Sequence, residues 1–159
     1  MNVNAAPAGA HGLAIPFDHN RLDRLMDQAG IDILVLTSKH NAQYFTGGHR
    51  ANFFDYMDAT GLSRYLPVFV YPKGAPEKAA YIGHRLEGFQ VRVQPLWVPE
   101  TQTNSGAAVD AMQKAVAYMA KANFKPKRIA AEFGFLPYDA AKVLRDAYPD
   151  ADWVDAVHV

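Results

Sequence analysis

The side chains best suited to recognise a ligand or a partner lie in one short stretch, NAQYFTGGHRANFFDY, at residues 41–56. After two adjacent glycines it presents an imidazole, a guanidinium, an amide and aromatic rings in close succession: His49, Arg50, Asn52, Phe53 and Tyr56. Rings beside an arginine and amide donors suit recognition of a small polar or charged group, and the same mixture is common at protein interfaces. The alternative is a loop whose rings fold back onto the core, which we expect of Tyr44 and Phe45.

No familiar catalytic or metal-binding pattern accompanies these side chains. The six histidines show none of the HxH or HExxH spacings that bind metals. The sequence lacks GxSxG, the setting of many hydrolase serines, and lacks the phosphate-binding patterns GxxxxGKS/T and GxGxxG. Asp55 and Asp58 would share one face of a helical turn, although a solvated loop is the simpler interpretation. We therefore expect no catalytic residue, no metal site and no cofactor in this chain.

Composition limits the classes of partner. Sixteen Lys and Arg balance sixteen Asp and Glu, so the chain has no general attraction for nucleic acid or for anionic membranes, and no net charge opposes self-association. There is no cysteine, which excludes disulfides and thiolate metal ligands. No apolar run approaches the roughly 20 residues that cross a bilayer. The start is rich in Ala and Gly and is unlike a secretory signal. We expect a flexible arm over residues 1–16 and a cytoplasmic protein.

The elements that must position these side chains alternate between helix and strand. A helix is predicted over residues 18–29, with Asp18 capping its first turn and Gly30 ending it. The apolar run 31–36 predicts a strand that is buried on both faces. A short helix over 37–45 follows, and the glycine pair ends it.

The second half predicts a hairpin and two further helices. Strands are predicted at 66–71 and 78–82 with a turn at 72–76, followed by a short helix at 83–89 and a strand at 91–98. Residues 101–104 are predicted as a polar loop, and Ser105 as the cap of a helix that reaches residue 123. A strand at 128–133, a helix at 138–148 and a strand at 153–157 complete the chain. The order predicts one α/β domain, residues 17–159, with a mixed sheet of about five or six strands and helices on its faces.

The sequence resembles a known family over most of its length. RLDRLMDQAGIDILVLTSKHNAQYFTGG is similar to the opening of the N-terminal domain shared by creatinase, prolidase and aminopeptidase P, including an N-x-x-Y-x-T-G motif. The motif residues are Asn41, Tyr44, Thr46 and Gly47. AAYIGHRLEGFQ and KRIAAEFGFLPYDAAKVLRDAYPDADWVDA resemble later parts of the same domain, so the likeness spans residues 18–156.

The resemblance implies a fold often compared to ribonuclease H, without catalytic residues of its own. In the family, a C-terminal pita-bread domain carries two divalent metal ions, such as manganese, on Asp, Asp, His, Glu and Glu. None of those segments is present here, so the chain is expected to be inactive alone. It is interpreted as a deliberate truncation of a metallohydrolase of the Xaa-Pro dipeptidase or creatinase kind, or as a free-standing relative.

The resemblance also implies a role for the opening stretch. Family members form homodimers in which the N-terminal domain of one subunit leans over the active site of the other. His49, Arg50, Asn52, Phe53 and Tyr56 would then help to close the pocket of the partner subunit, with His84 and Arg85 as a secondary site. Two alternatives remain: a stand-alone dimerising module, or a small-molecule binder that uses the Arg50 loop. Proline peptides, creatine and other small zwitterions are all open as substrates.

Overall fold

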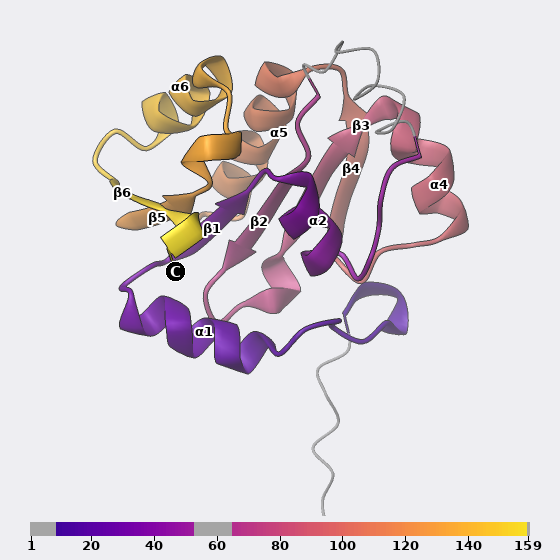
Figure 1. Cartoon of the computed structure of the whole chain (residues 1–159), viewed down its shortest axis with the longest axis horizontal. Helices are drawn as coiled ribbons and strands as arrows, with labels where there is room; N and C mark the ends of the chain where they lie inside the picture. The colour runs from indigo at the N-terminus through magenta and orange to yellow at the C-terminus, as the bar shows by residue number, and fades with distance from the viewer. Residues whose placement is uncertain (1–8, 53–64, 159) are drawn as a thin grey trace, which may run out of the picture.

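The computed structural model describes residues 9–52 and 65–158, and in these residues six strands form one mixed sheet in the order β4-β3-β2-β1-β5-β6 (Figure 1). The strands are β1 (Ile33–Leu36), β2 (Val68–Pro72), β3 (Ala80–His84), β4 (Glu100–Ser105), β5 (Arg128–Ala131) and β6 (Asp152–Asp155). β2 is antiparallel to both of its neighbours, and the other pairs are parallel. This arrangement confirms the predicted α/β class with a mixed sheet.

Helices cover both faces of the sheet (Figure 1). They are α1 (His19–Gln28), α2 (Lys39–Phe45), α4 (Gly88–Val93), α5 (Ala108–Lys121) and α6 (Tyr138–Ala147). Short 3-10 turns occupy Ala10–Gly12, Pro76–Lys78, Arg85–Glu87, Phe133–Phe135 and Ala156–His158. The α5 and α6 side chains pack with one face of the sheet, and α1 and α2 pack with the other. No helix in the described part of the chain is long and apolar enough to span a membrane.

Strand β1 lies in the middle of the sheet and confirms the prediction of a strand buried on both faces. Ile33 and Val35 join the core under α5 and α6, while Leu34 and Leu36 join the core under α1 and α2. All four residues are buried. Successive side chains of a strand point to opposite faces, so a strand with helices on both sides is apolar throughout.

The predicted helix signals are confirmed at the start of the chain. The Asp18 side chain accepts a hydrogen bond from the Arg21 backbone N–H at 2.9 Å, which caps α1. Gly30 follows α1 with φ +66°, the left-handed conformation that suits glycine. The Ser38 hydroxyl accepts from the Asn41 N–H at 3.1 Å and caps α2.

The strand predicted at 91–98 is wrong. Residues 88–93 form α4, which continues from the 3-10 turn Arg85–Glu87, and Pro95 follows it. The apolar pattern of this stretch came from Leu96, Trp97 and Val98, which are buried in the core without forming a strand. These three side chains cover part of the α1 and α2 face of the sheet.

The neighbouring strand is β4, in residues that were predicted as a polar loop. Its sequence ETQTNS is polar because β4 lies at the edge of the sheet and most of its side chains are only partly buried. Parallel hydrogen bonding to β3 holds it in place. Ser105 was predicted to cap the next helix, but its hydroxyl donates to the Gly83 carbonyl at 2.7 Å instead. Ala107 stands at the N-cap of α5 and makes no side-chain capping bond.

Residues 9–16, the second half of the predicted arm, lie against the body of the domain; residues 1–8 are outside the described part. A β-carbon added to Gly9 would lie 2.6 Å from the Trp97 carbonyl oxygen, so the chain passes very close to that residue. Pro16 likewise approaches Gly47, where an added β-carbon would lie 3.3 Å from the proline ring.

The pairing pattern places the carboxyl ends of β1, β3, β4, β5 and β6 at the same end of the sheet, together with the start of β2. We call this the C-terminal end of the sheet, and in α/β sheets ligands commonly bind there. Thr37, Tyr65, His84 and Glu132 are all found there, next to the ends of their strands.

Candidate functional site

The predicted site begins at the glycine pair that follows α2. Gly47 and Gly48 have φ values of +80° and +100°, so this turn needs residues without a β-carbon. The turn leads into residues 49–52, which we call the 49–52 segment. Phe53 and Tyr56, which were also predicted as site residues, lie outside the described residues, as do Asp55 and Asp58.

His49 points inward and meets Glu87, which was not predicted as a site residue. The Nε2 atom of His49 lies 2.9 Å from a carboxylate oxygen of Glu87. The exposed fractions of the two side chains are 4% for His49 and 0% for Glu87, so the contact is shielded from water. A buried charge needs several hydrogen bonds, and Glu87 has them.

Four donors surround the Glu87 carboxylate. They are the Tyr65 hydroxyl at 2.6 Å, the His84 backbone N–H at 2.5 Å, the Tyr81 hydroxyl at 2.8 Å and His49 Nε2 at 2.9 Å. We call these groups the Glu87 cluster. The two tyrosine hydroxyls also lie 3.3 Å from each other. Each carboxylate oxygen therefore accepts two hydrogen bonds, as an ionised carboxylate can.

The environment acts on the protonation of this cluster in two opposing ways. Burial by itself raises the pKa of the Glu87 carboxyl, but hydrogen bonds from His49, Tyr65, the His84 N–H and Tyr81 outweigh it, and the pKa lies below its usual value. Burial and the nearby Glu87 charge raise the pKa of the Tyr65 and Tyr81 hydroxyls. The cluster is therefore one anion surrounded by neutral hydroxyl donors.

The rest of the 49–52 segment is tied to α4 through one side chain. The Gln90 amide donates to the Arg50 carbonyl at 2.7 Å and accepts from the Asn52 N–H at 3.0 Å. The side chains of Arg50 and Asn52 are exposed, in contrast to that of His49. The segment thus has a fixed backbone and presents a guanidinium and an amide at the surface.

A second buried carboxylate, Glu132, follows β5 at the same C-terminal end of the sheet. It accepts from the backbone N–H groups of Thr37 and Ser38 at 2.5 and 2.7 Å, and from the Asn41 side-chain amide at 2.6 Å. We call these groups the Glu132 cluster. The N-x-x-Y-x-T-G motif thereby has a structural role, since Asn41 fixes the start of α2 against β5.

The rings of α2 differ from the prediction. Phe45 is buried in the core as expected, but Tyr44 is 61% exposed and packs edge-on against Phe45 with ring centres 5.3 Å apart. The prediction that both rings fold back onto the core is therefore wrong for Tyr44, because α2 covers the sheet with only one of its faces.

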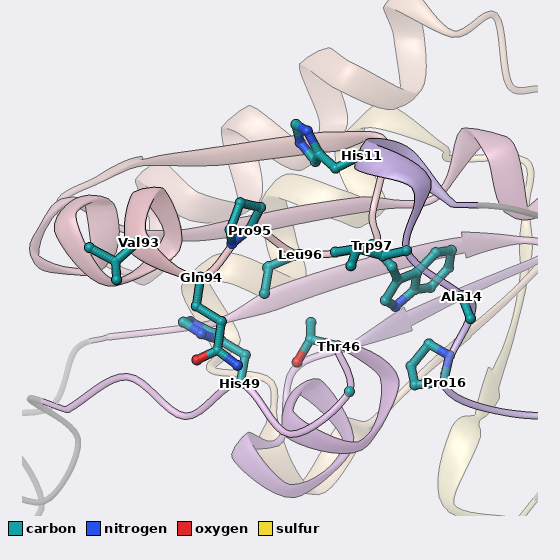
Figure 2. A pocket seen from close by; sticks show the side chains of 12 residues that line it. His11, Ala14, Pro16, Thr46, His49, Val93, Gln94, Pro95, Leu96 and Trp97 are labelled. Atoms are coloured by element: carbon teal, nitrogen blue, oxygen red, sulfur yellow. The ribbon is translucent and has the colours of Figure 1, made fainter.

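One pocket lies on the His49 side of the segment (Figure 2). It has a volume of about 480 Å³ and is formed between residues 11–16, the end of α2 and the connection from α4 to β4. Figure 2 shows His49 and Gln94 at one end of the pocket and Trp97 and Pro16 at the other. The Trp97 indole N–H donates to the Phe45 carbonyl at 2.7 Å, which fixes that wall.

Another pocket lies on the Arg50 side, at the carboxyl end of β1. Its volume is about 470 Å³. Basic side chains of Lys39, His40 and Arg50 line it, together with the rings of Tyr65 and Phe135. Consecutive residues, His49 and Arg50, therefore line different pockets.

The proposed secondary pair, His84 and Arg85, is divided between core and surface. His84 is buried, and its Nδ1 accepts from the Leu86 N–H at 3.3 Å, while its ring packs edge-on against Tyr65. Burial and the neighbouring Arg85 charge lower the pKa of the His84 imidazole. Arg85 is exposed.

The metal ions implied by the family do not fit this part of the protein. Among residues 9–52 and 65–158, no group of three or more His, Cys, Asp or Glu side chains is placed to hold a metal ion. Each carboxylate oxygen of Glu87 already accepts two hydrogen bonds from protein groups, and the Glu132 carboxylate accepts three N–H groups, so neither is placed as a metal ligand.

Sequence reasoning missed both buried glutamates. A glutamate is usually exposed, and neither residue stands in a catalytic or metal-binding motif. One signal was available for Glu87, since His84 and Glu87 stand three residues apart, the spacing of a capping box, and they form one in the structure.

Comparison with known proteins gives the family context. A family model described as Creatinase/Prolidase N-terminal domain matches residues 19–159. A search of curated proteins found no match. Among solved structures, the N-terminal domain of an X-Pro dipeptidase from Streptococcus pyogenes superposes with a TM-score of 0.60 at 13% sequence identity, covering 88% of this chain and 93% of that one.

Two further structures show the same fold. The N-terminal domain of the cytoplasmic peptidase PepQ from Mycobacterium tuberculosis H37Rv has a TM-score of 0.58 at 12% identity, covering 87% of this chain and 91% of that one. The Xaa-Pro dipeptidase from Bacillus anthracis has a TM-score of 0.59 at 18% identity. The match covers 87% of this chain but 32% of the Bacillus anthracis chain, so the present chain spans about a third of that protein.

Proposed function

The chain belongs to the creatinase/prolidase N-terminal domain family, and on that premise we propose that it is the non-catalytic domain of a metal-dependent hydrolase. The hydrolase would be of the Xaa-Pro dipeptidase, aminopeptidase P or creatinase kind. The domain would contribute to a homodimer and present the 49–52 segment at the active site of the partner subunit. Two divalent ions such as manganese would be bound by the catalytic domain, since the described residues offer no ligand set.

One observation carries this proposal. The 49–52 segment is fixed at its base by the buried His49–Glu87 contact and by the Gln90 hydrogen bonds nearer the surface, and the side chains of Arg50 and Asn52 are exposed. A rigid support with exposed donors is what a residue needs to act on a substrate held by another domain. An arginine that helps to close a site excludes water and strengthens the electrostatic interactions inside it.

The dimer part of the proposal is supported by an apolar surface on α4 and the turn before it. Leu86, Phe89 and Val93 are 62%, 72% and 68% exposed, and their spacing of three and four residues places them on one helical face. Exposed apolar side chains that form one patch are typical of interaction sites. In sedimentation experiments, Phe89→Asp should weaken self-association, whereas Tyr138→Asp, a matched change at another exposed ring, should not.

The cytoplasm is the location proposed for the domain, in keeping with the description of one structural neighbour as a cytoplasmic peptidase. Phe53 and Tyr56, which lie outside the described residues, are proposed to contribute to the same function as Arg50. His84 and Arg85 are proposed as a secondary group, with Arg85 the exposed member.

The proposal is tested by kinetics with an Xaa-Pro dipeptide and added Mn²⁺. The 159-residue chain alone should show no turnover, and turnover by it would refute the assignment. In the natural full-length polypeptide that carries this domain, Arg50→Ala should raise KM about tenfold or more, the effect of losing one charge-assisted hydrogen bond. Arg24→Ala, which removes an exposed arginine from α1, is the matched control and should leave KM unchanged.

A second function, direct binding of a small molecule by the isolated domain, is favoured by the pocket beside Arg50. Three basic side chains and two aromatic rings line this space of about 470 Å³, which suits a small carboxylate or zwitterion. Thermal shift measurements with dipeptides, creatine and betaines would test it. A shift that is lost in Arg50→Ala would favour this function, and the absence of any shift would exclude it for these compounds.

A further inference from the structure

The segments that precede and follow residues 53–64 both contact the same buried group, the Glu87 carboxylate. His49 lies before that stretch and Tyr65 after it, and both donate hydrogen bonds to the Glu87 carboxylate. The His49 bond falls on one carboxylate oxygen and the Tyr65 bond on the other. One side chain thus links two parts of the chain that are distant in sequence.

Glu87 acts together with Gln90, which stands three residues later. Residues three apart lie on the same side of a helix, so both side chains face the 49–52 segment. Gln90 holds the Arg50 carbonyl and the Asn52 N–H, and Glu87 holds the His49 ring. The backbone that carries Arg50 is therefore fixed on both sides of that residue.

The protein backbone also leaves room for this carboxylate. A β-carbon at Gly83 would lie 2.6 Å from a Glu87 carboxylate oxygen and 2.9 Å from the Tyr81 ring. Gly83 has no unusual backbone conformation that would need glycine, so the close approach of Glu87 accounts for its lack of a side chain.

We propose that Glu87 is a positioning residue for the 49–52 segment. Glu87 holds the His49 ring and, together with the Gln90 hydrogen bonds to the Arg50 carbonyl and the Asn52 N–H, sets the placement of Arg50. The inference rests on the proposed function in one respect only, namely that Arg50 acts on substrate. Charge-assisted hydrogen bonds to a carboxylate in a dry environment are stronger than neutral ones, so four of them give a rigid anchor. An uncharged residue of the same shape would hold the segment less firmly.

The first test measures amide hydrogen exchange in Glu87→Gln, which keeps the shape of the side chain and removes its charge. Exchange at residues 49–52 should accelerate by about tenfold or more relative to amides of β1 and β2, as the loss of a charge-assisted bond predicts. Glu132→Gln is the matched control, since it removes an equally buried carboxylate from another cluster. It should accelerate exchange at Thr37 and Ser38 and leave the relative rates at 49–52 unchanged.

The second test is a double-mutant cycle in the natural full-length polypeptide. Glu87→Gln should raise KM for an Xaa-Pro dipeptide more than it changes kcat. In the Arg50→Ala background the same change should have little further effect, because coupled residues are not additive. Full additivity of the two changes would overturn the claim that Glu87 acts through Arg50.

The outcomes separate the inference from the function on which it rests. Unchanged exchange at residues 49–52 in Glu87→Gln would overturn the positioning role, whatever the kinetics show. Faster exchange without any effect of Arg50→Ala on KM would uphold the positioning role and refute the proposed function. If Glu87→Gln does not fold, Tyr65→Phe removes a single donor to the same carboxylate and is expected to give a smaller acceleration at the same amides.

Discussion

The Glu87 and Glu132 clusters each stabilise a carboxylate that is buried at the C-terminal end of the sheet, but they do so with different donors. Within the described residues Glu132 accepts N–H groups alone, two from the backbone and one from the Asn41 amide. Glu87 accepts one backbone N–H and three side-chain donors, from His49, Tyr65 and Tyr81. The first cluster fixes backbone to backbone, and the second gathers side chains from separate segments.

This difference indicates a division of roles. The Glu132 cluster joins the end of β1 and the start of α2 to the end of β5, so it belongs to the framework of the fold. The Glu87 cluster joins β3 and the turn before α4 to His49 and Tyr65, which lie outside any helix or strand. We expect changes at Glu132 to affect global stability most, and changes at Glu87 to affect the 49–52 segment most.

The largest effect is expected for Glu132→Ala. It removes the acceptor of three N–H groups at the end of β1 and the start of α2, and unpaired buried donors are costly. The free energy of unfolding should fall by about 3–5 kcal/mol, measured by urea denaturation. Asp146→Ala, which removes an exposed carboxylate paired with Lys142, should change it by less than about 0.5 kcal/mol. A loss at Glu132 as small as that at Asp146 would contradict a framework role.

A smaller loss is expected for Gly83→Ala, which crowds the Glu87 cluster. The added methyl group would displace a carboxylate that four donors hold in place, at a cost of about 1–3 kcal/mol. Gly134→Ala is the control, because an added β-carbon there meets no atom within 4 Å. Equal stability of the two variants in urea denaturation would show that Glu87 has space to move.

Removing one hydroxyl should have a smaller effect again. Tyr65→Phe deletes one hydrogen bond to the buried carboxylate and should cost about 1.5 kcal/mol. Tyr118→Phe deletes a neutral hydrogen bond to the exposed Lys78 carbonyl and should cost clearly less. Thermal denaturation of both variants would measure the difference, and equal losses would argue that Glu87 is not ionised.

The smallest effect concerns pH. The pKa of the Glu87 carboxyl in the folded protein is below its usual value of 4.5, so this group stabilises the fold above pH 4.5. That contribution should decline as the pH falls below 4.5 and through the lower pKa of the folded state. The stability difference between wild type and Glu87→Gln should therefore be constant near neutral pH and shrink in acid. A difference that grows in acid would reverse the assigned sign.

Much of the fold could be predicted from the sequence because its signals are local. Asp18, Ser38 and Gly30 mark the ends of helices by their own chemistry, and the run 31–36 shows its burial directly. The edge strand β4 could not be found in this way, because its polar side chains are typical of a loop and its stability comes from pairing with β3.

The candidate site could be predicted only in part for a related reason. His49, Arg50 and Asn52 stand next to each other in sequence, so their unusual mixture is visible. Glu87 and Glu132 take their role from donors that folding brings together, and Thr37 is 95 residues away from Glu132. The spacing of His84 and Glu87 indicates a capping box, but it does not indicate that the Glu87 carboxylate is also surrounded by distant hydroxyl groups.

The most direct test of the account is the protonation of the His49 ring, measured by the ¹⁵N chemical shifts of its two nitrogens at neutral pH. An ionised Glu87 can only accept, so His49 must carry a proton on Nε2. We expect a protonated Nε2 in the wild type and a changed Nε2 signal in Glu87→Gln. An unprotonated Nε2 in the wild type would mean that Glu87 does not hold the 49–52 segment as described.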